Sequence, residues 1–441
     1  MKKQIKWLHQ ELDTWIGEGL VTPDQAVAIR ARYPEKGLPW GTLIFSGLGG
    51  VIIGLGVILL FAYNWQEIPK FAKLAIVFAA LAAIHAVGVR LFLRSDRWRA
   101  LGDALCLLGT MFFGAGIWLV AQIYNIQEHY PNGLFIWALG ALALAWALPS
   151  ILQAILASIL LVVWCGTEAV GFGRTMHLGA LLILVLLGPL AYRERSRVLA
   201  VILVPSFILS LVFVFSGFDA NAGVVVAAVL SVGALLIAAG ILVRQTREFP
   251  QSAASFLFFG WISYLLTLYL LTFPDLTRHL LERGTIRLPL GVLAYWLGAL
   301  LLGLTAWSVV AYRSYILKQD QDVTPDQFLI PLTLLLPPSF FLSQAGFEGW
   351  LMAAPFNMVF LAIAISMMTR GCRQGLLQPT VLGSILLAIL TLTRYVDLFQ
   401  SLLARGLVFI VMGVAIFIEG TLYSRAKQQK VIKDSSLAPG K

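Results

Sequence analysis

Charge is the scarcest property of this chain. Only 12% of its 441 residues are Asp, Glu, Lys or Arg, while 59% are hydrophobic. A soluble protein carries about 25% charged residues. The few charges gather in short clusters, and the runs between them stay apolar for roughly 17–25 residues, which is the length of a helix that spans the ~30 Å hydrocarbon core of a bilayer. A predominantly soluble fold is therefore excluded.

Cysteine and the common catalytic motifs are also scarce. Cys106, Cys165 and Cys372 have no CxxC spacing and no nearby pair of histidines, so we interpret them as small core residues. The chain contains no Walker A motif, no HExxH and no GxSxG, which argues against the corresponding ATPases and hydrolases. The N-terminal sequence lacks the apolar stretch of roughly 7–15 residues found in a signal peptide. We expect no metal and no cofactor.

The apolar runs predict an all-α fold, a polytopic bundle of about 14 transmembrane helices. The expected spans are residues 41–63, 71–92, 100–121, 134–149, 151–170, 178–192, 198–216, 223–243, 252–273, 288–312, 328–344, 351–368, 376–393 and 406–423. Only Pro149-Ser150 separates the fourth span from the fifth, and the count would be about 12 if that pair were re-entrant. We expect Pro331, Pro337, Pro338 and Pro355 to kink or break the spans that contain them.

Three regions follow from this pattern. Residues 1–40 read as a small helical hairpin on the membrane face, with Leu8, Leu12 and Trp15 at helical spacing and Thr22-Pro23 as a second helix start. Residues 41–423 are the expected helix bundle, and 424–441 are expected to be a basic, disordered tail.

The basic residues are distributed asymmetrically. With the N-terminus in the cytoplasm, 24 of the 32 Lys and Arg residues fall on the cytoplasmic side and 8 on the other, while the acids divide 14 and 8. This bias fits orientation on an anionic leaflet better than nucleic-acid binding. We expect both termini to be cytoplasmic and the lipid bilayer to be the principal partner.

An unusual polar stretch, Ala121–Gly133, interrupts the apolar runs and lies on the expected outer face. Together with other outer loops it could form a site that binds a polar headgroup or relays protons. The candidate residues are Asn64, Glu67, Gln122, Tyr124, Asn125, Glu128, His129, Arg394, Asp397 and Arg405. The alternative is structural: Trp and Tyr favour the interface, short loops are polar, and Arg394 and Asp397 could pair at a helix end.

A few ionisable residues fall within the spans. Asp103 and Arg90 could form a salt bridge near the cytoplasmic side, and His85 could join Asp103 in a proton path or bond only to its own helix. Glu419 is expected to reach toward the basic cytoplasmic edge. Glu168, near the outer end of its span, could face water.

Four stretches carry a family likeness. They are Leu8, Leu12, Trp15, Gly19-Leu20, Gln25, Ile29 and Tyr33; Asn64-Trp65; Ala121–Tyr124; and Arg394–Phe399. Together they resemble a bacterial family of membrane proteins, the domain of unknown function 2157 group, over roughly the first third to half of the chain. The resemblance implies a multi-pass inner-membrane protein of a Gram-negative-type bacterium or cyanobacterium. It implies no reaction, substrate or catalytic residue.

Three functions remain open at this stage. The first is a transporter or flippase-like protein for a polar or lipid-linked compound, which predicts a water-accessible cavity lined by Gln122, Glu128, Arg394 and Asp397. The second is a non-transporting scaffold for an envelope protein partner, which predicts a closed bundle with those polar residues paired. The third is a membrane-embedded enzyme acting on lipid-linked substrates, which the short outer loops disfavour.

Overall fold

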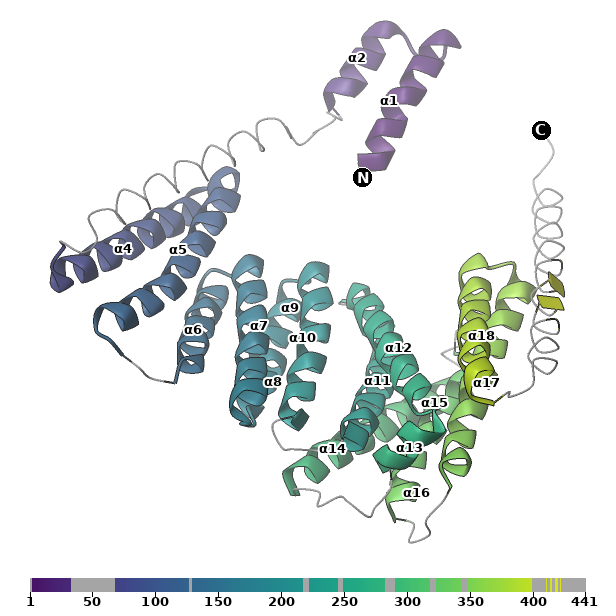
Figure 1. Cartoon of the computed structure of the whole chain (residues 1–441). Helices are drawn as coiled ribbons and strands as arrows, with labels where there is room; N and C mark the ends of the chain where they lie inside the picture. The colour runs from purple at the N-terminus through teal and green to yellow at the C-terminus, as the bar shows by residue number, and fades with distance from the viewer. Residues whose placement is uncertain are drawn as a thin grey trace. The chain divides into compact units, whose positions relative to one another are not determined.

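The computed structural model describes residues 2–32, 68–126, 129–216, 222–244, 249–281, 290–317, 323–342 and 348–398, with a few positions between 410 and 421. All regular elements in these ranges are helices (Figure 1), which confirms the all-α class. The expected span 41–63, most of 406–423 and the tail 424–441 lie outside the described residues. The total number of spans therefore stays a prediction.

The chain divides into two units, residues 1–78 and 79–441. The first unit contains α1 (Lys2–Gly17) and α2 (Pro23–Arg32). Thr22 caps α2 by accepting a hydrogen bond from the Gln25 backbone, while the Gln25 side chain accepts one from the Thr22 backbone. This reciprocal pair is a capping box. Arg30 forms an ion pair with Asp13 of α1. Whether these two helices lie on the cytoplasmic face stays a prediction.

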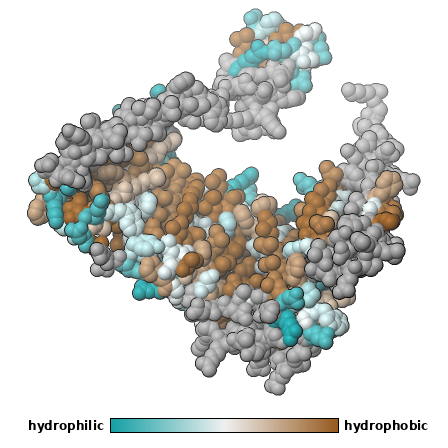
Figure 2. All heavy atoms as spheres, viewed as in Figure 1, coloured by the Kyte–Doolittle hydropathy of each residue, from teal (hydrophilic) through white to brown (hydrophobic). Residues whose placement is uncertain are grey.

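Eight described helices are long and apolar enough to cross a membrane. They include α4 (Lys70–Arg94), α5 (Asp96–Ile123), and α7 (Ile151–Gly166) with its π-helical continuation η1 (Thr167–Gly171). Shorter apolar helices occupy four more of the expected spans. In Figure 2 the visible surface of the described helices is largely hydrophobic, and hydrophilic residues gather near the helix ends. Contiguous exposed apolar surface of this extent is typical of helices that face lipid or a partner.

The second unit holds two groups of packed helices. The first group contains α5, α6 (Pro131–Ala147), α7, η1, the interrupted segment α8 (His177–Leu182), η2 (Ile183–Leu187) and α9 (Gly188–Arg193), and α10 (Arg197–Ser216). Its core lies mainly between α6, α7 and α10. Because Pro189 has no N–H and its ring meets the preceding turn, the helix widens into the π-turn η2 just before it.

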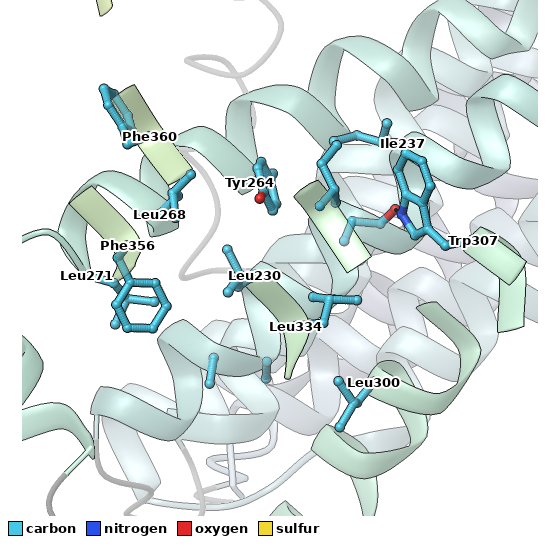
Figure 3. Packing of buried hydrophobic residues seen from close by; sticks show 14 of the residues in the cluster. Leu230, Ile237, Tyr264, Leu268, Leu271, Leu300, Trp307, Leu334, Phe356 and Phe360 are labelled. Atoms are coloured by element: carbon cyan, nitrogen blue, oxygen red, sulfur yellow. Dashed lines mark hydrogen bonds between the residues drawn. The ribbon is translucent and has the colours of Figure 1, made fainter. Parts of the chain in front are cut away.

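The second group holds the larger core. It contains α11 (Ala222–Arg244), η3 (Pro250–Ser252), α12 (Ala253–Leu270), α13 (Pro274–Leu281), α14 (Leu290–Ala311), η5 (Tyr312–Ile316), η6 (Pro325–Phe328), α15 (Leu329–Leu334), α16 (Leu336–Leu342), α17 (Gly349–Gln374) and α18 (Leu377–Leu398). Figure 3 shows Tyr264, Leu268, Trp307 and Phe356 among the buried side chains of this core. A small cluster around Val204 and Val232 joins α10 to α11.

Two hydrogen bonds between buried side-chain groups and neighbouring helices lie in this larger core. The Tyr264 hydroxyl lies 2.7 Å from the hydroxyl of Thr333, and the Trp307 indole donates to the carbonyl of Ala234 at 2.9 Å. Buried polar groups are hydrogen-bonded because an unpaired one loses its bonds to water without replacement. These two bonds tie α12 to α15 and α14 to α11.

The prolines have different effects in the two predicted spans, the segment of α15 and α16 and the helix α17. Pro337 and Pro338 lie at the start of α16, and the chain is interrupted at Leu335 between α15 and α16. Pro355 lies inside α17, which continues from Gly349 to Gln374. The expected break is therefore confirmed for the first segment, while the second remains one helix.

Glycines of α5 allow close contacts with neighbouring helices. A Cβ on Gly109 would lie 2.6 Å from the ring of His85, and one on Gly114 would lie 2.2 Å from the indole of Trp137. α4 and α6 therefore approach α5 through these glycines. Small residues permit such approach where packing drives helix association.

Candidate functional site at the end of α7

The polar stretch after α5 begins with a well-formed helix cap. Asn125 adopts a left-handed conformation with φ of 51°. The Ile126 backbone donates to the Ala121 carbonyl at 2.9 Å and the Asn125 backbone to the Gln122 carbonyl at 3.4 Å. This is the Schellman arrangement, and asparagine tolerates the left-handed position better than most residues. The cap ends α5 and turns the chain toward His129.

His129 pairs with an acid from a different helix. Its Nε2 lies 2.8 Å from Oε2 of Glu168. The Glu168 side chain is 2% exposed and that of His129 is 18% exposed. Among the described residues Glu168 is the only Asp, Glu, Lys, Arg or His that is buried. The expectation that Glu168 faces water is therefore wrong, because the carboxylate is enclosed by the helix group and bonded to the imidazole.

The end of α7 holds Glu168 in this position. The helix widens into the π-turn η1, in which Glu168 is the second residue. Gly173 then takes a φ of 60°, and the backbone of Arg174 donates to the Glu168 carbonyl at 3.0 Å. A backbone φ near +60° is favourable only for glycine and a few other residue types. π-turns inside helices occur frequently at functional sites.

An aromatic ring lies beside the pair. Phe172 presents its edge to the His129 ring with centroids 4.2 Å apart, and Tyr130 lies 5.5 Å from Phe172. Trp118 of α5 lies 6.4 Å from Tyr130. Phe172, Tyr130 and Trp118 are themselves exposed. They form a row of aromatic side chains that leads from the imidazole to the surface.

The pair can bind one proton in two ways. An imidazolium with a carboxylate is an ion pair, and a neutral imidazole with a carboxylic acid is an uncharged hydrogen bond. Among the described residues no three His, Cys, Asp or Glu side chains come together, so the pair gains no third such ligand for a metal ion there. The chemistry that fits two such groups is proton exchange or recognition of one polar group.

A second polar cluster lies at the opposite end of α7. Ser150 caps the helix by accepting from the Gln153 backbone at 3.2 Å, and its hydroxyl donates to the Asp103 carboxylate of α5. The Gln153 side chain is wholly buried, and neither its amide oxygen nor its nitrogen has a hydrogen-bond partner among the residues that the structure describes. The sequence did not single out Gln153. Its position three residues after a cap serine was the available signal.

The structure describes only part of the predicted outer-face cluster. Gln122, Tyr124 and Asn125 are exposed beside the His129 loop. Arg394 and Asp397 belong to α18, which packs on α17, whereas α5 packs on α6 and α7 (Figure 1). The side chains of Arg394 and Asp397, and the residues Asn64, Glu67, Glu128 and Arg405, lie outside the described part of the chain. The predicted shared cavity therefore remains a prediction.

The predicted intramembrane groups are placed as follows. The Nδ1 of His85 lies 3.0 Å from the Leu81 carbonyl of its own helix. Arg90 is exposed, and no ion pair joins it to Asp103 in the described residues. Asp103 is bonded to Ser150 instead. Glu419 lies outside the described part of the chain.

Comparison with known families bears on the first part of the chain. Residues 13–154 match the family model described as Predicted membrane protein (DUF2157). The resemblance seen in the sequence is thereby confirmed over about a third of the chain. The DUF2157 match includes Asp103, His129 and Ser150 and ends before Glu168. No curated protein and no solved structure matches the chain. The match and the apolar helices together describe a membrane protein.

Proposed function

We propose that this protein is a multi-pass inner-membrane transporter or flippase-like protein for a polar or lipid-linked compound, with both termini in the cytoplasm. The hydrogen bond between the buried Glu168 and the partly buried His129 carries the proposal. Ionisable residues inside membrane bundles are costly to keep and mark proton relays or substrate paths. In the proposed cycle, Glu168 exchanges its imidazole partner for a proton or for the polar group of the compound.

A scaffold for an envelope protein partner is the second candidate. Three ionisable side chains are hydrogen-bonded: His129 to Glu168, Asp103 to Ser150, and His85 to a carbonyl of its own helix. A purely structural bundle would pair its polar groups in this way, because an unpaired polar group in lipid costs several kcal/mol.

Flux measurements separate the two candidates. Purified protein is placed in liposomes that contain a pH-sensitive dye, and sugars, amino acids, nucleosides and small anions are added one class at a time. A headgroup-labelled lipid with an impermeant quencher tests flipping in a parallel preparation. We expect the wild type to move one of these, and Glu168→Gln and His129→Ala to lose most of that flux.

Glu194→Gln is the matched control, because Glu194 is a partly exposed acid at the end of α9. It should retain wild-type flux. Wild-type flux in Glu168→Gln would contradict the role of the pair. If correctly inserted protein moves none of these compounds, the scaffold becomes the better explanation.

A further inference from the structure

One face of α7 is buried from end to end and contains several polar side chains. At 100° per residue, Ser150, Gln153, Ser158, Trp164 and Glu168 fall within less than half of the helix circumference. All five are 5% exposed or less. Ala154, Ala157 and Leu161 share this face and are wholly buried. The polar groups therefore lie along the interior side of a helix that qualifies as a membrane span.

The polar groups in the middle of this face find no partner among the described residues. Within that part of the chain, both amide atoms of Gln153, the Ser158 hydroxyl and the Trp164 indole nitrogen are buried without a hydrogen bond. A serine in the other group of helices behaves differently. Ser231 of α11, which is equally buried, donates to the Ala227 carbonyl of its own helix at 2.9 Å.

The helix cap explains why the side-chain amide of Gln153 does not form the hydrogen bond that a capping box would give it. In a capping box, the side chain of the third helical residue bonds back to the backbone N–H of the cap residue. Here the Ser150 N–H already donates to the Ala145 carbonyl at 3.1 Å. The Ser150 hydroxyl is also engaged, with Asp103 and with the Gln153 backbone. The Gln153 amide therefore needs a partner that the described part of the chain does not provide.

We propose that the buried face of α7 binds a chain of internal water molecules that connects the Asp103–Ser150 hydrogen bond with the His129–Glu168 pair. Buried water bonds typically to two to four polar groups that would otherwise lack partners. An amide, a hydroxyl and an indole N–H supply both acceptors and donors along this face. If the proposed transport function holds, on which this second step rests, the chain carries protons to Glu168 from the opposite end of the helix.

The spacing of the two ends suits this role. Positions 150 and 168 are 18 residues apart, which corresponds to about 27 Å at the rise of an α-helix. This is close to the ~30 Å thickness of the hydrocarbon core. Ser210 of α10 is buried and lies beside the Cys165 thiol. It supplies a further hydroxyl between Ser158 and Glu168.

Radiolytic hydroxyl-radical footprinting of the full chain tests for this water directly, because bound water generates the radical beside the residue it modifies. Trp164 and Trp307 form a matched pair. They are 5% and 1% exposed, and only the Trp307 indole is bonded to a protein carbonyl. We expect Trp164 to be oxidised several-fold faster than Trp307. Equal, slow oxidation of both would overturn the proposal.

Substitutions test whether the side chains of Gln153 and Ser158 bind this water. Gln153→Leu combined with Ser158→Ala should bring Trp164 oxidation down to the Trp307 level, while Ser231→Ala should leave it unchanged. Oxidation of Trp164 that persists in the folded double variant would overturn the assignment. If the double variant does not fold, the wild-type comparison of the two tryptophans still decides.

The two proposals can fail separately. Fast oxidation of Trp164 together with unchanged flux in Glu168→Gln would remove the transport function and keep the water. Slow oxidation together with a flux that depends on Glu168 would remove the water chain and keep the transport function.

Discussion

At the scale of single residues, Glu168 dominates the energetics of the site. Its carboxylate is enclosed on all sides, and His129 is the partner that the structure provides for it. Removing a charge from water costs several kcal/mol, and a well-placed partner recovers much of that cost. The pair therefore contributes mainly by preventing an isolated buried charge.

We predict that His129→Ala lowers the free energy of unfolding by about 3–5 kcal/mol, because Glu168 is then left unpaired. His129→Ala combined with Glu168→Gln should recover part of this loss, since no buried charge remains. Unfolding of the detergent-solubilised protein by SDS, followed by circular dichroism, measures both effects.

The exposed Asp13–Arg30 pair is the control, with side chains 69% and 39% exposed. Asp13→Asn should change stability by no more than about 1 kcal/mol, since surface pairs contribute little. A loss in His129→Ala as small as that would show that Glu168 is not held as an unpaired charge.

Asn125 gives a second test at this scale. Asn125→Val should destabilise the protein by about 1–2 kcal/mol, because a β-branched residue is strained at positive φ. Asn125→Gly should be neutral or slightly stabilising at the same position. Thermal unfolding of the two variants in detergent compares them, and equal melting temperatures would contradict the left-handed cap.

The sequence identified one half of the site and missed the other. His129 stood out in a polar loop, whereas Glu168 was expected to meet water because it lies near a span end. Which end of a helix is enclosed depends on the packing of other helices, and one apolar run cannot reveal that. The available signal was that Glu168 is the only acid in the run from Ile151 to Gly171.

At the scale of elements, the closeness of neighbouring helix backbones determines whether a glycine can be replaced by a larger residue. A Cβ on Gly233 of α11 would lie 2.8 Å from the backbone nitrogen of Tyr264 and 3.1 Å from its Cα. Because a backbone atom cannot turn aside as a flexible side chain can, the two helices would have to separate. Gly298 of α14 has nothing within 4 Å of the same position.

We therefore predict opposite effects of two identical substitutions. Gly233→Ala should destabilise the protein by about 1–3 kcal/mol through overpacking. Gly298→Ala should stabilise it by up to about 1 kcal/mol, because alanine favours the helix. Melting temperatures in one detergent measure both, and a neutral Gly233→Ala would mean that α11 and α12 are less closely packed.

The sequence predicted most of the elements and only part of their irregularities. Twelve of the spans expected from apolar runs coincide with described helices. The sequence could predict them because helix length and hydropathy are local properties. The outcome at the prolines depends on how many bonds are lost. Pro337 and Pro338 together remove two consecutive donors and interrupt the helix, whereas Pro355 removes one and α17 continues.

At the scale of the whole molecule, contacts between helix ends define two opposite sides. Asp103 bonds to Ser150 at one end of α5 and α7, and His129 bonds to Glu168 at the other. These contacts agree with the alternation of sides expected from the spans. The sequence could propose this alternation from its basic residues, but it could not reveal which helices pack together.

Cysteine labelling tests the expected orientation. In a variant with Cys106, Cys165 and Cys372 replaced by alanine, single cysteines at Ser95 and Arg195 should react with an impermeant maleimide only from the cytoplasmic side. Cysteines at Asn125 and Arg174 should react only from outside, since all four positions are exposed. Reaction of Asn125 and Arg174 from different sides would contradict the placement of α5–α7.

The π-turn at the end of α7 makes the site sensitive to chain length. A π-turn holds one residue more than the α-helical turn it replaces. Deleting Val170 would remove that extra residue and would leave Phe172 three residues after Glu168 instead of four. Phe172 would then leave the edge of the His129 ring, although neither residue had been substituted. The geometry at this position therefore depends on the number of residues as much as on their identity. Inserting or deleting a single codon there would change the surroundings of the imidazole.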